Sequence, residues 1–233
     1  MALYAIGDLH LSLGVSKPMD VFPGWDNYVE RLTANWNRVV GPEDTVIIMG
    51  DVSWGINFEE AEPDFRFIDR ELNGSKIVMK GNHDYWWNTM AKMQSFLAAH
   101  DFSSIRLLFN NAYKVDGRWL CGTRGWTMDG SDPDELKIIL REAGRLERSL
   151  AAAGEGERIA FLHYPPILQN GKSTAIIEVM KKYGVRRCYY GHLHGSAIAW
   201  AVNREVDGID YRLLSADALG FCPYKIEVKC DNE

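Results

Sequence analysis

The sequence has no excess of basic residues, no long apolar segment and no closely spaced cysteines. Its 26 lysines and arginines are outnumbered by 32 aspartates and glutamates, so the formal net charge is −6. Proteins that neutralise many phosphates along a nucleic acid usually carry a basic stripe, whereas the longest basic runs here are the pairs Lys181-Lys182 and Arg186-Arg187. These absences disfavour binding to extended nucleic acid but are compatible with a small phosphorylated ligand.

Signals for a membrane or for secretion are also missing. No window approaches the ~20 apolar residues that span a bilayer, and the N-terminus lacks the basic region and the longer apolar run of a signal peptide. The four cysteines, Cys121, Cys188, Cys222 and Cys230, show no CxxC spacing, which favours free thiols in a reducing compartment. We expect a cytoplasmic protein without a membrane partner, and the sequence does not indicate its oligomeric state.

The remaining composition is that of an ordinary globular protein. The chain has 233 residues, of which 46% are hydrophobic and 25% charged, and this length suffices to bury a full core. It contains no Pro/Gly/Ser-rich linker, internal repeat or low-complexity tract. We therefore predict a single domain over residues 1–233.

Short apolar runs rich in β-formers alternate with stretches of helical periodicity, which predicts an α/β layered fold. The predicted strands are Leu3–Ile6, Thr45–Met49, Lys76–Lys80, Ile105–Phe109, Arg158–Leu162 and Arg187–Tyr190. Helices are predicted around residues 29–40, 65–72, 90–97, 133–153 and 174–182.

Part of the chain is expected to be antiparallel. Asp116-Gly117, between two β-rich runs, is a two-residue hairpin signal. A second hairpin is predicted from Ala197–Val202 and Val206–Leu214, and a terminal strand from Tyr224–Val228.

Polar side chains follow five of the predicted strands, at the point where each strand ends. They lie in the blocks Gly7-Asp8-Leu9-His10, Gly50-Asp51, Gly81-Asn82-His83-Asp84, His163 and Gly191-His192-Leu193-His194. Ligands of open α/β sheets bind at the carboxyl ends of the strands. Turn and cap formation would explain single members of this set, but five of the six histidines occur in it, and only His100 lies elsewhere.

Imidazole and carboxylate ligands without thiolate suit divalent Mn, Fe, Zn or Mg. Seven candidate ligands exceed what one tetrahedral ion uses, and they fit two ions that share a bridging carboxylate. The sequence therefore predicts two divalent metal ions as cofactors.

These five blocks, in this order and spacing over residues 7 to 194, resemble the motif set of the calcineurin-like metallophosphoesterase superfamily. The resemblance implies a four-layer α/β/β/α sandwich with mixed sheets and a dinuclear site at one end. It also implies how the ligands divide between the ions: Asp8, His10 and His194 on one, Asn82, His163 and His192 on the other, with Asp51 bridging both.

Two further residues acquire roles through the resemblance. His83 matches a histidine that binds no metal, contacts the phosphate and protonates or steadies the leaving oxygen. Asp84 resembles the carboxylate that orients this histidine. A hydroxide bridging the ions would attack phosphorus directly, so that no covalent protein nucleophile is needed.

The sequence departs from one branch of the superfamily. Protein Ser/Thr phosphatases carry an Asp-Arg pair shortly after the second block, whereas Asp51 is followed by Val52-Ser53-Trp54-Gly55. Phosphoprotein phosphatase activity is therefore disfavoured. Arg124, in a loop between two glycines, is a candidate replacement that binds the substrate phosphate, and a solvated or salt-bridged arginine is the alternative. Lys17 and Lys172 are expected to be solvated.

A bacterial group of predicted phosphohydrolases is similar to this chain also at Thr123-Arg124-Gly125-Trp126 and Leu214-Ser215-Ala216-Asp217. The resulting hypothesis is a metal-dependent phosphohydrolase acting on a small phosphorylated substrate. A phosphodiesterase or nuclease on short or cyclic nucleotides is the alternative enzyme. A protein-interaction scaffold, like the retromer subunit of this fold, is the remote alternative, because it predicts gaps in the ligand set and this sequence has none.

Overall fold

The computed structural model describes residues 1–127 and 132–227. Val228, where the terminal strand was expected to end, and Cys230 lie outside the described residues. Cys121, Cys188 and Cys222 are free thiols, as predicted. Within the described ranges, no helix combines the length and the apolar character needed to cross a membrane.

The first sheet has the strand order β13–β1–β2–β3–β4. Its strands are β1 (Leu3–Ile6), β2 (Thr45–Ile48), β3 (Ser75–Val78), β4 (Ile105–Leu107) and β13 (Tyr224–Lys225). The first four are parallel to one another, and β13 is antiparallel to β1. The last described strand of the chain thus lies beside the first.

The second sheet has the order β11–β12–β10–β7–β6–β5. Its strands are β5 (Ala112–Val115), β6 (Arg118–Thr123), β7 (Arg158–Leu162), β10 (Arg187–Tyr190), β11 (Glu205–Val206) and β12 (Ile209–Leu213). The four central strands are parallel, and the edge strands β5 and β11 are antiparallel to their neighbours. A separate small hairpin pairs β8 (Ile167–Leu168) with β9 (Gly171–Lys172).

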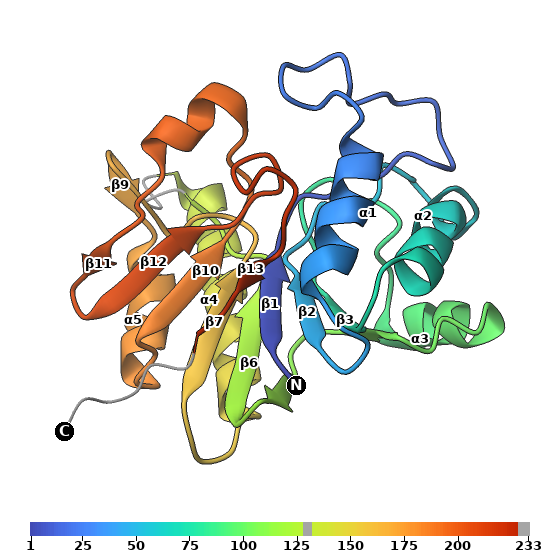
Figure 1. The fold of residues 1–233 in the computed structure, drawn as a ribbon. Coiled ribbons are helices and arrows are strands. Elements are labelled where there is room, and N and C mark those ends of the chain that lie inside the picture. The colour runs from blue at the N-terminus through green and yellow to red at the C-terminus, as the bar shows by residue number, and fades with distance from the viewer. Residues whose placement is uncertain (128–131, 228–233) are drawn as a thin grey trace.

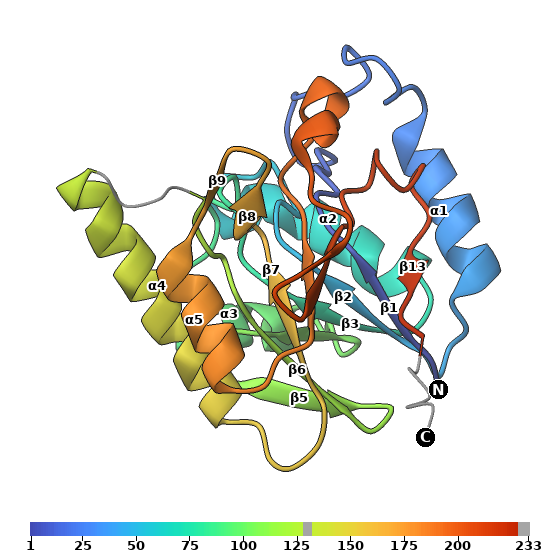
Figure 2. The same ribbon diagram turned by 90° about the vertical axis from the view of Figure 1, so that its left-hand side faces the viewer.

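Helices cover the outer face of each sheet, so the predicted four-layer α/β/β/α sandwich with mixed sheets is confirmed (Figures 1 and 2). The first sheet is covered by α1 (Tyr28–Val39), α2 (Phe58–Glu71) and α3 (Met90–Ala99). The second is covered by α4 (Pro133–Ala151) and α5 (Thr174–Lys182). A 3₁₀ helix, η1 (Gly195–Trp200), follows β10.

Side-chain alternation along the strands explains why the layers form. On β1, Leu3 and Ala5 pack between the two sheets, while Tyr4 and Ile6 pack beneath the helices. All four residues are buried, as expected for parallel strands covered on both faces. This is why the strands appear in the sequence as continuous apolar runs rather than as alternating ones.

The hairpin predicted from Ala197–Val202 and Val206–Leu214 is wrong. Residues 195–200 form η1, and the observed hairpin joins β11 to β12 through Asp207-Gly208. Both turn residues have positive φ, 51° and 79°, as the type I′ turn preferred in two-residue hairpins requires. The Asp116-Gly117 hairpin between β5 and β6 is confirmed, with φ values of 49° and 77°.

Candidate metal centre

The five motif blocks meet at one edge of the sandwich. They follow β1, β2 and β3 of the first sheet and β7 and β10 of the second. The chain starts at the lower end of β1 in Figure 1, so the carboxyl ends of the parallel strands point upward in that view. The site therefore lies where the upper edges of the two sheets adjoin.

Unusual backbone geometry aims several of these side chains. Asp8, His10, Asp51 and His192 have φ values of 63°, 47°, 50° and 74°, a left-handed region that residues other than glycine seldom adopt. Such conformations cost about 1–3 kcal/mol each and cluster at functional sites. Four such conformations among the predicted ligands indicate a functional site, in which the surrounding fold holds these residues in strained positions.

Two glycines provide the space that the carboxylates occupy. A Cβ atom at position 81 would lie 2.1 Å from Asp51 Oδ1, and one at position 191 would lie 2.3 Å from Asp8 Oδ2. Real Cβ atoms do not approach other atoms so closely. Gly81 and Gly191 are therefore required for the positions of both acids.

One group of ligand atoms comprises Asp8, His10 and His194, which lie within 4.8 Å of one another. The Nε2 atoms of His10 and His194 face each other at 3.3 Å, and His194 Nε2 lies 3.4 Å from Asp8 Oδ1. Donor atoms at these separations can bind one cation together. This is the trio assigned by resemblance to the first ion.

A second group comprises Asp8, Asp51 and His163, again within 4.8 Å. Asp8 belongs to both groups. Asp51 Oδ2 lies 3.5 Å from His163 Nε2 and 3.7 Å from His10 Nε2, so this oxygen lies between a histidine of each group. Asn82 Oδ1 lies 2.6 Å from His163 Nε2. The position of Asp51 fits the bridging role predicted for it.

His192 has a different relation to this cluster. Its imidazole belongs to neither of the two groups found among the described residues, but the centre of its ring lies 5.2 Å from that of His163. Its backbone amide donates hydrogen bonds to both carboxylate oxygens of Asp8, at 3.0 Å. His192 therefore positions Asp8, and its role as a metal ligand stays a prediction.

In two of the histidines predicted to bind metal, His163 and His194, the Nδ1 atom has a fixed partner. His163 Nδ1 lies 3.1 Å from the carbonyl oxygen of Met49. His194 Nδ1 lies 2.9 Å from Asp217 Oδ1, while Asp217 Oδ2 accepts the amide of Gly195 at 2.9 Å. Metal-binding histidines are commonly oriented by such contacts. Asp217 was not predicted as a site residue, although its segment belongs to the resemblance.

Asp84 holds the loop that carries Asp51 through hydrogen bonds to its backbone. Its fully buried carboxylate accepts the backbone amides of Asp51 and Val52 at 2.9 Å each and that of Gly81 at 2.6 Å. The amide of Ser53, at 3.4 Å, and Trp86 Nε1, at 3.0 Å, donate two further hydrogen bonds. Among the described residues, the hydrogen bonds of this carboxylate hold backbone around Asp51 rather than the imidazole of His83, the contact that resemblance predicted.

His83 lies at the open side of the cluster and is partly exposed. Its amide donates to Asp51 Oδ1 at 2.8 Å, and its ring lies 4.5 Å from that of Trp54, centre to centre. The ring of Trp54 also stacks on His10 at 4.8 Å. Burial, followed by the charge of Lys17, lowers the pKa of His83.

The basic side chains considered for phosphate binding agree with the expectations: Lys17 and Lys172 are exposed, and Arg124 lies beside an acid. Lys17 is exposed, but its Nζ lies 3.3 Å from the centre of the Trp54 ring, above the site. The Arg124 guanidinium lies 3.8 Å from the buried Glu142 of α4 and near the Tyr164 ring. The backbone carbonyl of Arg124 accepts the amide of His163 at 3.1 Å, so Arg124 is at the metal-centre edge of its sheet.

The electrostatics of the cluster favour bound cations. Burial, and then the neighbouring Asp8, raise the pKa of Asp51 to about 7. Burial opposes charge on Asp8 and His194 too, but their mutual attraction outweighs it, lowering the pKa of Asp8 and raising that of His194 to about 10. Two acids placed this close are compensated best by positive charge between them. The donor set therefore fits divalent ions.

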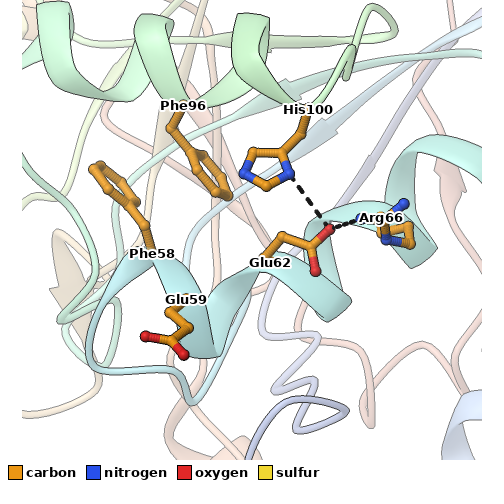
Figure 3. Close-up of a pocket in the computed structure, with 6 residues that line it drawn as sticks. All are labelled: Phe58, Glu59, Glu62, Arg66, Phe96 and His100. Carbon is orange, nitrogen blue, oxygen red and sulfur yellow. Dashed lines mark hydrogen bonds and ion pairs between the residues drawn. The ribbon is translucent and has the colours of Figure 1, made fainter.

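The sixth histidine, His100, lies outside the metal centre and packs against aromatic side chains. His100 follows α3, and its ring stacks on Phe102 with centres 5.4 Å apart. Its Nδ1 lies 3.6 Å from Glu62 of α2, beside a pocket lined also by Phe58 and Phe96 (Figure 3). Its surroundings differ from those of the five clustered histidines, as the sequence pattern indicated.

Comparison with known proteins agrees with this geometry. A family model described as calcineurin-like phosphoesterase matches residues 1–196. The chain belongs to this family. The resemblance inferred from the five blocks is thereby confirmed, and the protein is a phosphoesterase-type hydrolase. No curated protein matches the sequence of this phosphoesterase.

Solved structures support the fold of this phosphoesterase. A protein of unknown function, AQ665 from Aquifex aeolicus, is similar with a TM-score of 0.50 and 16% identity, over 96% of this chain and 95% of the other. TT1561 from Thermus thermophilus is similar with a TM-score of 0.50 and 11% identity, over 82% of this chain and 81% of the other. At these identities the likeness concerns the fold alone.

Proposed function

We propose that this phosphoesterase is a single-domain hydrolase that cleaves a phosphate ester of a small substrate at a centre of two divalent ions. The observation that carries the proposal is the pair of ligand groups, Asp8–His10–His194 and Asp8–Asp51–His163, which share an acid and lie side by side. Asn82 and His192 would complete the second group. The ligand types suit Mn, Fe, Zn or Mg.

The bound ions would supply a hydroxide at neutral pH and neutralise charge on the phosphoryl oxygens. Other residues of this chain would hold the proposed ligands in place. Asp84 fixes the Asp51 loop, Asp217 orients His194, and the Met49 carbonyl orients His163. Such prior organisation lowers the cost of ordering the site when it binds metal and substrate.

His83 is proposed to act on the substrate. Its backbone amide donates a hydrogen bond to Asp51, which keeps the imidazole beside the proposed ligands. His83 itself belongs to neither of the two ligand groups. Its lowered pKa favours the neutral ring in the free protein, and a bound phosphate dianion would favour the protonated ring. In that form His83 would contact the phosphate and donate its Nε2 or Nδ1 proton to the leaving oxygen.

The first experiment tests both the metals and the reaction. Purified protein is loaded in turn with Mn, Mg, Zn and Fe, its metal content is measured, and a panel of phosphate mono- and diesters is assayed. We expect two ions per chain and turnover of at least one ester. The His100→Ala variant, which changes the one histidine outside the cluster, should match the wild type in both measurements.

Two results would contradict the proposal. Fewer than two tightly bound ions together with no turnover of any ester would favour the scaffold alternative. Turnover that persists after complete metal removal would also contradict it. The ratio of monoester to diester turnover decides between a phosphatase and the alternative phosphodiesterase or nuclease acting on short or cyclic nucleotides.

A further inference from the structure

A lysine lies over the open side of the metal centre. Lys17 belongs to the segment between β1 and α1, which extends above the upper edge of the sandwich in Figure 1. Its Nζ atom lies 3.3 Å from the centre of the Trp54 ring, and the ring of Trp54 lies 4.5 Å from that of His83, centre to centre. Only the indole ring thus separates the ammonium from the residue proposed to act on the substrate.

The segment that carries Lys17 is attached to the protein at a buried acid. The amide of Leu13 donates to the carboxylate of Asp64 at 2.7 Å. Asp64 is fully buried in α2 and also accepts the hydroxyl of Ser53, the residue before Trp54. Asp64 therefore joins the segment of Lys17 to the segment of Trp54, which explains why the lysine and the ring lie together.

The charge of Lys17 is available to a ligand. Its side chain is exposed, and within residues 1–127 and 132–227 it forms no ion pair with a carboxylate. A cation over an exposed tryptophan gains about 0.5–1 kcal/mol, which favours this position without neutralising the charge. Arg124 differs, because its guanidinium already lies 3.8 Å from the buried Glu142.

A substrate with two negative charges would need more positive charge than the ions supply. Two divalent ions, the hydroxide that they supply and the carboxylates of Asp8 and Asp51 have a net charge of about +1 together. A phosphate monoester carries nearly two negative charges at neutral pH, whereas a diester carries one. The centre therefore balances a diester by itself, and it balances a monoester with the help of one further cation such as Lys17.

We propose that Lys17 binds an anionic phosphoryl oxygen of the substrate and so favours phosphate monoesters over diesters. The inference rests on the proposed function, because the phosphoryl group is taken to lie at the metal centre. It deepens that function by assigning the substrate class as monoesters. A diester carries a second carbon substituent on one of these oxygens, so it offers Lys17 fewer contacts and half of the charge.

The test compares two stable ligands that differ by one methyl group. Phenylphosphonate imitates a monoester, and its monomethyl ester imitates a diester. Both are titrated calorimetrically into the Mn-loaded wild type, which should prefer phenylphosphonate, and into Lys17→Met, which keeps an unbranched side chain without the charge. The variant should bind phenylphosphonate about 5- to 15-fold more weakly, a loss between that of an exposed ion pair and that of a charge-assisted hydrogen bond. Its affinity for the methyl ester should change less than about twofold.

Two further variants serve as controls. Lys17→Arg keeps the charge and can stack on Trp54, so it should retain most of the affinity for phenylphosphonate. Lys114→Met removes the same charge from another lysine near an indole ring, since Lys114 Nζ lies 5.7 Å from the centre of the Trp119 ring. Trp119 is near the start of β6, at the end of the strand opposite to the metal-centre edge. Lys114→Met should therefore bind both ligands as the wild type does.

Turnover gives a second measurement. Because 4-nitrophenyl phosphate and bis(4-nitrophenyl) phosphate release the same leaving group, the ratio of their kcat/KM values reports the preference for a monoester, and Lys17→Met should lower it by a similar factor. An unchanged affinity of Lys17→Met for phenylphosphonate would overturn the proposal, as would an equal loss for both ligands or equal affinities in the wild type. A wild type that cleaves neither ester but keeps a Lys17-dependent preference for phenylphosphonate would contradict the proposed function and leave the role of Lys17 in binding intact.

Discussion

The first sheet contributes Asp8, His10, Asp51 and Asn82 to the candidate metal centre, whereas the second contributes His163, His192 and His194. Oxygen donors thus come from one half of the sandwich, and imidazoles come mainly from the other. The halves also differ in how they hold their ligands, since Asp51 is fixed by the buried Asp84 within its own half.

Two histidines of the second sheet are oriented by fixed oxygen atoms, one from each half of the fold. His163 is held by the carbonyl of Met49 at the end of β2, and His194 by Asp217, which lies beyond β12. The comparison teaches that Asp51 and His194 are each supported within their own half, whereas Asp8 and His163 are held by backbone groups of the other half. Substitutions in the two halves should therefore have different consequences.

The largest expected effect is that of Asp51→Asn, because Asp51 stands between both ligand groups. An amide keeps the shape but loses the negative charge, so at least one ion should be lost and turnover should fall below detection. Circular dichroism should show an intact fold. Metal analysis is the deciding measurement: two tightly held ions with wild-type turnover would remove Asp51 from the bridging position.

His83→Ala tests whether a residue of the first half can act without binding metal. Both ions should remain, while turnover falls roughly 10²–10⁴-fold, as for loss of a general acid. The loss should be smaller for nitrophenyl phosphate than for an alkyl phosphate, because nitrophenolate departs without a proton. Equal losses with metals intact would contradict the general-acid role and leave phosphate binding alone.

Asp84→Asn tests the claim that Asp51 is held within the core of the first half. The new amide group faces backbone N–H donors, so buried hydrogen bonds are lost and the free energy of unfolding should fall by about 2–4 kcal/mol. Urea unfolding of the metal-free protein measures this. A midpoint equal to that of the wild type would show that the Asp51 loop does not depend on Asp84.

Asp217→Asn is the matching change in the second half. Loss of the carboxylate behind His194 should weaken metal binding by about 10–100-fold. The stability of the metal-free protein should change little, because the Asp217 side chain is not fully buried. Metal affinity is measured by competition with a chelator. A destabilisation as large as that of Asp84→Asn would remove the contrast between the halves.

Arg124→Ala should have the smallest effect, because only the binding of phosphate should change. If its guanidinium contacts a phosphate oxygen, the inhibition constant of inorganic phosphate should rise about tenfold to hundredfold. Lysine should restore only part of this, since it lacks the planar fork. Its proximity to Glu142 provides the competing explanation, and an unchanged constant would assign Arg124 to that ion pair.

Much of this site was predictable because buried parallel strands leave continuous apolar runs in the sequence. The polar residue that ends each run then marks the edge of the sheet, which is how Asp8, Asp51 and His163 were placed together. The Asp207-Gly208 turn carries the same signal as Asp116-Gly117. The hairpin there was nevertheless placed too early, because the 3₁₀ segment at 195–200 is apolar enough to resemble a strand.

Contacts behind the ligands were not predictable in the same way. Asp217 is 23 positions from His194, and nothing in local periodicity links an acid in one loop to a ring in another. The hydrogen bonds of Asp84 depend likewise on how two loops of the first sheet approach each other. The resemblance implied that Asp84 orients His83, but the packing of the two loops directs these side chains to different partners.

The position of β1 between β2 and the late strand β13 determines when this centre is completed during protein synthesis. Asp8 is made well before its partner, because the amide that holds its carboxylate belongs to His192, 184 positions later. Gly7, beside it, pairs with Ser215. A ribosome-bound fragment therefore exposes its acids long before their partners exist. We expect metal uptake to follow synthesis of the segment from His192 to Asp217, when the proposed ligands and the groups that hold them are all present.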